Sequence, residues 1–326
     1  MVCSKKGFLD SSGFPFSCCL KMIRKQDSTM VKSYLFLLIC VVCWGSNFVF
    51  GAILVKAFPP MFLAVFRLLF IAIFMISYAG MMKKWKKIHK QDWFMIFLLG
   101  LIGTCINQWS FYAALVTAHP TTSALILALA PITTSLLASI FLKESLTKQF
   151  CIGSLVALIG VFLVITNGKE LHLTIGLIWI FITMLTFAIS IIMIKKLTEK
   201  YHSITISLYS NIIGFGSFIP FLATEKALKI SMEILPWTLL IVTAILMHGI
   251  CTLIWNHQIQ IVGASKAAMF LNLEPFIAML VGLIILKNSV SISQLSGGLL
   301  IIIGVILSTS MKIKKEVGEQ LYSQKS

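Results

Sequence analysis

Charged residues are scarce in this sequence, and acidic residues are the scarcest of them. Only 12% of the 326 residues are charged, with 11 Asp and Glu against 27 Lys and Arg, whereas 58% are hydrophobic. A soluble domain of this length needs a much larger polar surface. Together with a mean hydropathy of +0.97, this composition excludes a large soluble domain and indicates a chain that lies in a lipid bilayer.

Several catalytic motifs are also missing. The sequence has no Gly-x-x-x-x-Gly-Lys-[Ser/Thr] phosphate loop and no Gly-x-Ser-x-Gly nucleophile elbow, and its histidines form no metal-binding cluster. We therefore expect no cofactor, no metal and no enzymatic activity. A membrane enzyme acting on lipids would need clustered His, Asp or Glu at the membrane surface, and the sequence has no such cluster. Uphill movement of a solute would need a gradient or a partner chain.

The eight cysteines show neither the spacing of a zinc site nor that of a secreted disulfide framework. Cys40 and Cys43 form a Cys-x-x-Cys pattern, but they lie inside the first apolar run. A redox or metal site is one interpretation of this pair. Two buried thiols that act as small apolar side chains are the other, and they fit an apolar run better.

Ten apolar runs follow one another, each near the roughly 20 residues that a spanning helix needs. The predicted fold class is all-α integral membrane with ten transmembrane helices. The run at 203–223 is the weakest of them because it carries several Ser and Thr residues and an Asn, and the basic stretch 83–87 is the clearest break. We place the helices at about 33–54, 61–82, 92–113, 119–142, 149–167, 174–194, 203–223, 237–258, 263–286 and 292–311.

Loop charge supports ten helices. If both termini are cytoplasmic, 20 Lys and Arg fall in cytoplasmic segments and five in outer loops, with Arg67 and Lys266 inside helices. The positive-inside rule predicts this bias. The predicted location is the cell inner membrane, with a multi-pass chain and cytoplasmic termini. The net charge of +16 is thus explained by short loops, and we expect no nucleic-acid partner.

The chain also contains an internal repeat. A shift of 144 residues aligns 124–163 with 268–307 and gives 15 identities in 40 positions. Since each half holds five helices, the second half must be inverted, and inverted repeats with a midplane site between them mark many secondary transporters. The predicted organisation is an N-terminal tail (1–32), two five-helix repeats (33–167 and 174–311) and a C-terminal tail (312–326). Residues 1–29 are either a disordered tail or the result of too early a start codon.

Charges inside a membrane are costly and usually functional. Arg67, Lys266 and Glu274 are the three candidates. Lys266, Phe270 and Glu274 share one helix face because they are four residues apart. Glu274 can take a proton or bind a substrate amine, while the alternative is a structural ion pair with Lys266 or Arg67. Lys266 can instead extend to the cytoplasmic interface.

Polar and aromatic residues form faces on other predicted helices. His248, Thr252 and Trp255 lie at i, i+4 and i+7, and His248 is a candidate proton carrier or substrate contact. A histidine that is only hydrogen-bonded within the bundle is the alternative. The remaining candidates for a substrate cavity are Trp44, Asn47, Trp109 and Tyr112. The helix-breaking residues Pro131 and Pro275 occupy equivalent positions in the repeats.

Several stretches resemble the EamA-domain family of the drug/metabolite transporter superfamily. Residues 44–47 (Trp-Gly-Ser-Asn), followed by the Pro pair at 59–60 and Arg67, are similar to its first two helices. Residues 131–144 are similar to its fourth helix with its closing Glu144, and residues 263–275 to its ninth. The likeness covers about 33–311. One departure is residues 287–288 (Lys-Asn), where an acidic residue is usual, and it puts a symmetric gating role of the two acids in doubt.

The resemblance implies a ten-helix bundle with a central cavity that opens alternately to each side. Members commonly export amino acids or related metabolites, and some import metabolites. We therefore expect a secondary transporter that exports an amino acid or a similar small solute, with the bilayer as its surroundings. The alternatives are an exchanger or importer of a nucleotide- or sugar-type solute, which needs more cations than Arg67 and Lys266, and a structural membrane protein without transport. Substrate and oligomeric state stay open.

Overall fold

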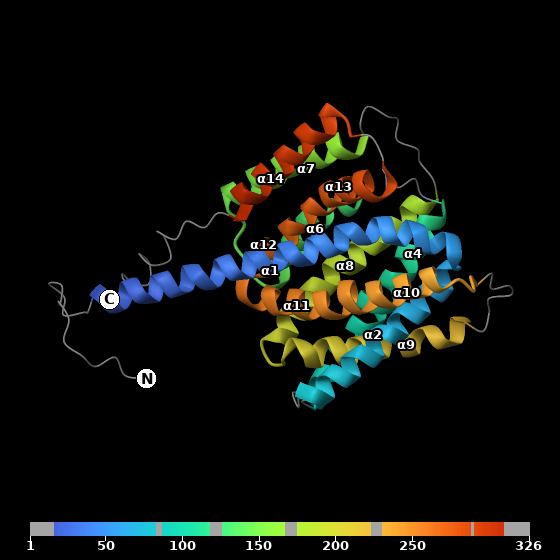
Figure 1. Ribbon diagram of the computed structural model, residues 1–326. Coiled ribbons are helices and arrows are strands. Elements are labelled where there is room, and N and C mark those ends of the chain that lie inside the picture. The colour runs from blue at the N-terminus through green and yellow to red at the C-terminus, as the bar shows by residue number, and fades with distance from the viewer. Residues whose placement is uncertain are drawn as a thin grey trace.

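The computed structural model describes residues 16–82, 87–117, 126–166, 175–222, 230–287 and 290–309, and every regular element in them is helical. Figure 1 shows the helices running side by side in one bundle. The first half contains α1 (Phe16–Ala57), α2 (Pro60–Met82), a third segment made of η1 (Lys90–Asp92), α3 (Trp93–Leu98), η2 (Leu99–Ile106) and α4 (Asn107–Thr117), then α6 (Ala130–Phe141) and α7 (Lys148–Thr166).

The second half repeats this order. It contains α8 (Gly176–Thr198), α9 (Ser203–Leu222), an eighth segment made of α10 (Ile234–Val242), η3 (Thr243–Ile250) and α11 (Cys251–Val262), a ninth made of α12 (Ala264–Met269), η4 (Phe270–Leu273) and α13 (Glu274–Leu286), and finally α14 (Ile292–Thr309). The described residues therefore form ten helical segments, as predicted. Seven helices are long and apolar enough to cross a membrane by length and composition, and helices suit lipid because they satisfy their backbone internally.

The predicted helix limits need correction at several places. The first helix was predicted at 33–54, but α1 runs continuously from Phe16 to Ala57. The eighth was predicted to end at 258, but α11 continues to Val262. The start of the predicted fourth helix (119–125), Asn288 and the predicted tail 312–326 lie outside the described residues. The polar run at 203–223 is a helix because its hydroxyls face the protein: Ser203, Thr205 and Ser207 are buried.

The 144-residue offset extends to details of the backbone. The two π-helical stretches, η2 (99–106) and η3 (243–250), differ by 144 at both ends. Pro131 and Pro275 occupy the first turn of α6 and α13. Lys143 and Lys287, with φ of 55° and 54°, adopt the left-handed conformation just after these helices. A π-helical stretch and a left-handed residue are both uncommon local backbone conformations. Their recurrence at equivalent positions confirms that the two halves share one fold.

Helices α7 and α14 show how the halves are related. A Cβ on Gly153 would lie 2.6 Å from the carbonyl oxygen of Gly304, and a Cβ on Gly160 would lie 2.5 Å from that of Gly297. Under the 144-residue shift Gly153 corresponds to Gly297, and Gly160 to Gly304. Each glycine therefore contacts the counterpart of the other glycine and not its own counterpart. A two-fold axis between inverted repeats produces this exchange. Small residues let the two backbones approach closely, and Figure 1 shows α7 and α14 side by side at one edge.

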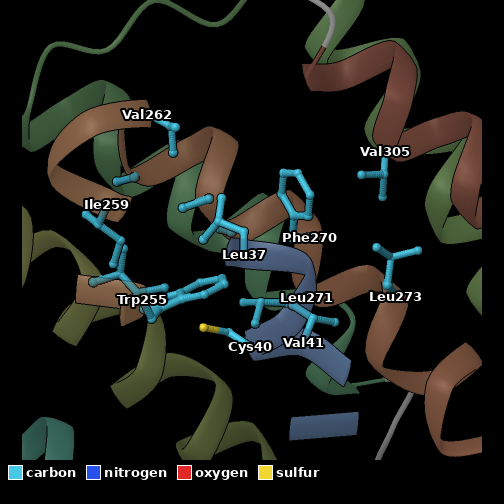
Figure 2. Close-up of a cluster of buried hydrophobic side chains, with 14 of the residues drawn as sticks. Leu37, Cys40, Val41, Trp255, Ile259, Val262, Phe270, Leu271, Leu273 and Val305 are labelled. Atoms are coloured by element: carbon cyan, nitrogen blue, oxygen red, sulfur yellow. The ribbon is translucent and has the colours of Figure 1, made fainter. Parts of the chain in front are cut away.

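The buried core lies where α1 crosses the second half. Figure 2 shows Leu37 of α1 between Trp255 of α11 and Phe270 of η4, with Val41 of α1 near Leu271. Gly45 lets α1 approach α13, since a Cβ there would lie 2.9 Å from the carbonyl oxygen of Glu274. This close crossing positions the start of α13, and with it Glu274, beside Gly45 of α1.

Candidate functional site

A cavity of about 220 Å³ lies inside the bundle. At roughly 30 Å³ for each water, it holds about seven waters, a size that fits a small solute. Its walls come from helical segments one to four and six to nine, whereas α7 and α14 contribute no lining residue. Seven of the predicted site residues line it: Trp44, Asn47, Tyr112, His248, Thr252, Trp255 and Glu274.

Glu274 is the acidic residue of this cavity. It is the first residue of α13, directly after the tight turn of η4, and it lies near the middle of the ninth segment. Within the described residues, no hydrogen bond or ion pair reaches its carboxyl group. The equivalent position in the first repeat is Ala130, which also lines the cavity. The repeats thus meet at this level with one carboxyl group in place of two.

Aromatic rings cover one side of the cavity. The ring of Trp44 lies 4.8 Å from that of Trp255 and 6.4 Å from that of Phe187, measured between centroids. The indole N–H of Trp44 donates to the carbonyl oxygen of Met247, within the π-helical stretch η3. A π-helical turn is wider than an α-helical one and is frequent at functional sites. Here the turn fixes the orientation of a cavity wall.

Arg67 lies behind the cavity and is fully buried. One terminal nitrogen, Nη1, donates to the hydroxyl of Thr243 at 3.2 Å; the other, Nη2, donates to Oδ1 of Asn47 at 3.2 Å and to Nδ1 of His248 at 2.7 Å. Since a guanidinium only donates, Nδ1 of His248 must accept and the ring must be neutral in this arrangement. The cation is therefore held by Asn47, Thr243 and His248 and is not among the lining residues.

Three of the predicted site residues lie elsewhere. Trp109 is 38% exposed and its ring lies 4.8 Å from that of Trp179, away from the cavity. Phe270 is buried against Tyr34, with centroids 5.4 Å apart. Lys266 of α12 does not line the cavity, and within the described residues no carboxylate lies within ion-pair distance of it. The ion pair of Lys266 or Arg67 with Glu274, weighed above as the structural alternative, is not formed.

Sequence reasoning missed the contribution of α9 to the site. Ser207, Ser210 and Asn211 line the cavity, and Asn256 of α11 donates to the hydroxyl of Ser207 at 2.9 Å. The signal was present in the sequence, because the predicted helix 203–223 carries five Ser and Thr residues together with Tyr209 and Asn211. Polar groups that cannot face lipid must face a cavity or a partner.

The chain matches a family model in both halves. The model of the EamA-like transporter family matches residues 31–166 and again residues 174–310. The chain belongs to the EamA-like transporter family.

Relatives of this EamA-like transporter span most of its length. An uncharacterized transporter of Bacillus subtilis (strain 168), YyaM, is 30% identical over 66% of this chain and 72% of that protein. An uncharacterized transporter of Archaeoglobus fulgidus is 25% identical over 85% of this chain and 98% of that protein. An uncharacterized inner membrane transporter of Salmonella typhimurium, YicL, is 24% identical over 85% of this chain and 94% of that protein.

The fold also matches a solved crystal structure. It superposes with a TM-score of 0.71 at 15% identity and covers 85% of this chain and 98% of that chain. At this low identity, the match supports only a similarity of fold. Together with the family model, it supports a multi-pass membrane transporter with two five-helix repeats.

In this EamA-like transporter, two polar contacts join distant segments at one face of the bundle. Successive segments run antiparallel, so every second connection lies at the same face of the bundle. We term the face that holds the beginning of the bundled part of α1 and the end of α14 the terminal face. It also holds residues 87–92, 142–147, 199–202 and 263. Here the carboxylate of Glu144 accepts from the backbone N–H groups of Ala264 (2.9 Å) and Ser265 (3.1 Å) and from the Ser265 hydroxyl (2.7 Å).

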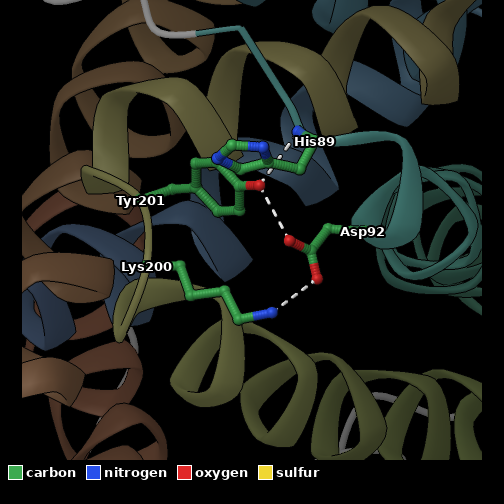
Figure 3. A network of polar contacts seen from close by, with 4 residues as sticks. All are labelled: His89, Asp92, Lys200 and Tyr201. Atoms are coloured by element: carbon green, nitrogen blue, oxygen red, sulfur yellow. Dashed lines mark hydrogen bonds and ion pairs between the residues drawn. The ribbon is translucent and has the colours of Figure 1, made fainter.

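The second contact on the terminal face is the network in Figure 3. Asp92 accepts from the ammonium of Lys200 at 2.9 Å and from the hydroxyl of Tyr201 at 2.8 Å, and that hydroxyl accepts from the backbone N–H of His89 at 3.0 Å. The hydrogen bond with Asp92 raises the pKa of Lys200, so the lysine stays charged throughout the neutral range. Both contacts join the first half to the second and hold the terminal face together.

Proposed function

We propose that the protein is a secondary active transporter that exports a small metabolite, an amino acid or a related amine, through the cavity between the repeats. The observation that carries this proposal is the position of Glu274. An acidic side chain without a partner lies in a cavity lined by both repeats, near the middle of the membrane-spanning helices. Substrate and coupling-ion sites of inverted-repeat transporters occupy this place.

The proposed coupling follows from the cost of an isolated buried charge. A carboxylate without a counter-charge in a mostly apolar cavity is strongly disfavoured, so Glu274 should bind a proton or a cationic group in turn. Competition between the two on one carboxyl group links proton movement to substrate movement. His248 was the other predicted proton carrier. Because its Nδ1 accepts from Arg67, protonation would break that hydrogen bond, and Glu274 is the better-supported coupling group.

We further propose that the protein lies in the cell inner membrane with the terminal face in the cytoplasm. The 20-to-5 distribution of basic residues supports this orientation. Under it, the contacts of Glu144 and Asp92 close the cytoplasmic side. A phosphorylated or nucleotide-type solute is the less favoured alternative, because neither Arg67 nor Lys266 lines the cavity and several cations would be needed.

Transport by purified protein in liposomes tests the proposal. Protein-loaded vesicles should exchange at least one radiolabelled amine or amino acid faster than empty vesicles, with a rate that depends on pH. Glu274→Gln should remove the pH dependence, because an amide does not titrate. Glu199→Gln, an exposed acid just after α8, is the matched control. Absence of exchange across a broad metabolite panel would contradict transport, and retained pH dependence in the Glu274 variant would contradict its coupling role.

A further inference from the structure

The charges of the cavity point to a narrower class of substrate, and this step rests on the proposed function. We infer that the preferred substrate is an organic amine with an apolar or aromatic body and no carboxylate, so that the cavity selects cations over zwitterions. Three features carry the inference: the distribution of charged groups around the cavity, the aromatic rings in its wall, and the hydrogen-bonding atoms that lack partners.

The charged groups favour a cation. A zwitterionic amino acid needs a cation for its carboxylate as well as a carboxylate for its amine. The cavity offers a carboxylate through Glu274, but no lysine or arginine of the described part of the chain lines it. The nearby Arg67 is 0% exposed, and both of its terminal nitrogens already donate to Asn47, Thr243 and His248. Its Nε has no partner within the described residues, but Arg67 is buried and does not line the cavity, whereas its partners Asn47 and His248 do. A substrate carboxylate could therefore reach the guanidinium only if these lining side chains moved.

The walls favour the same class. The rings of Trp44 and Trp255 lie together beside the cavity, with Phe187 set edge-on against Trp44. An ammonium group is attracted to the face of an aromatic ring, most strongly to tryptophan. A carboxylate gains nothing from such a face. The aromatic rings therefore favour a cation at one end of the substrate and an apolar body along the rest.

Unpaired hydrogen-bonding atoms add a third argument. The side-chain oxygens Oδ1 of Asn211 and Asn256 are buried and accept no hydrogen bond within the described residues. Both residues line the cavity and are 7% and 2% exposed. Two vacant acceptors suit the N–H donors of an amine. Among the fully buried atoms of the lining residues, the vacant donor is the indole N–H of Trp255, and a neutral donor does not replace a counter-charge for a carboxylate.

Four analogues with one common body test the inference. 2-Phenylethylamine carries only the amine, phenylalanine both charges, 3-phenylpropionate only the carboxylate, and 2-phenylethanol neither. Binding to the purified full-length protein is measured by isothermal titration calorimetry in lipid nanodiscs near neutral pH. We expect the amine to bind at least about tenfold tighter than phenylalanine, and the acid weakest of the four.

Variants connect the preference to Glu274. Glu274→Gln should weaken binding of the amine at least about tenfold and leave that of the alcohol within about twofold, because only the charge is removed. Glu274→Asp keeps the charge and should retain the preference for the amine. It therefore tests the role of the charge even if the glutamine variant does not fold. Glu199→Gln should match the unaltered protein. Each variant is compared by size-exclusion profile and thermal unfolding.

The outcomes separate this inference from the proposed function. If phenylalanine binds as tightly as the amine or tighter, or if Glu274→Gln does not weaken the amine, the inference is wrong. If none of the four binds at millimolar concentration, an aromatic amine substrate is also excluded. Transport itself stands in each of these cases as long as vesicles exchange another solute. Conversely, selective binding of the amine without exchange by vesicles would support the inference on the cavity and contradict transport.

Discussion

Replacing Glu144 with glutamine should loosen the terminal face. Ala264 and Ser265 are the first two residues of α12, and the first N–H groups of a helix have no partner within the helix. Here Glu144, from the loop after α6, accepts from both of them and from the hydroxyl of Ser265. Protection of these two amides from solvent therefore depends on one side chain of the other repeat.

The size of the effect follows from these three hydrogen bonds. A bond to a charged group contributes about 1.5–3 kcal/mol, against about 0.5–1.5 kcal/mol for a neutral one. A negative charge at a helix N-terminus adds about 0.3–1 kcal/mol. A glutamine keeps one acceptor oxygen, so it can serve one backbone amide fully but not both. We expect the free energy of local opening to fall by about 2 kcal/mol, which is about 30-fold in the opening equilibrium.

Hydrogen exchange with residue-level fragmentation measures this opening directly. The amides of Ala264 and Ser265 should exchange about 30-fold faster in Glu144→Gln, whereas helix-interior amides of α7 and α14 should be unchanged. Glu199→Gln is the control, since it removes an exposed charge from the same face. Exchange at Ala264 and Ser265 that stays within about threefold of the unaltered protein would refute the reasoning. A uniform increase across all helices would show global destabilisation instead of a loosened contact.

Three further substitutions test packing, the buried cation and the cavity wall. Gly160→Leu should destabilise the bundle by about 1–3 kcal/mol, because α7 and α14 leave no room for a side chain there; thermal unfolding in detergent should show it, while Gly80→Leu, with nothing within 4 Å, should have little effect. Arg67→Lys should lower stability by about 2–4 kcal/mol, because one ammonium cannot replace the fork that holds three partners; a change in midpoint denaturant below the measurement error would contradict this. Trp255→Phe should weaken binding of a transported solute several-fold, as measured by calorimetry. Trp109→Phe is the control and should not weaken it, since Trp109 lies away from the cavity. Equal effects of the two substitutions would contradict this placement.

Much of the candidate site was predictable because it depends on rare residues. Glu274 was identified from the cost of a charge in a membrane, and that argument needs no partner. His248, Thr252 and Trp255 were grouped by helical periodicity alone, and all three line the cavity. Trp109 failed the same reasoning. Its neighbours Asn107 and Gln108 line the cavity, whereas Trp109 lies on another side of the same helix and packs against Trp179.

Arg67 illustrates a second limit. Its charge and depth were evident from the sequence, but its partners come from α1 and η3, 20 and 176–181 residues away. No local pattern distinguishes a guanidinium that faces a cavity from one that is enclosed by Asn47, Thr243 and His248. The difference bears on whether the cavity can accept an anion, so the substrate class that we infer depends on the tertiary structure.

The sequence by itself determined the ten helices, their order and the 144-residue repeat, because apolar length and repeated residues are properties of the chain. It also determined that Pro131 and Pro275 occupy equivalent positions in the two copies. Only the tertiary structure decided which polar groups meet in the cavity and which are enclosed behind it. The physical reason is that lipid and protein interior are both apolar, so the hydrophobic pattern that separates inside from outside in a soluble protein does not separate them in a membrane.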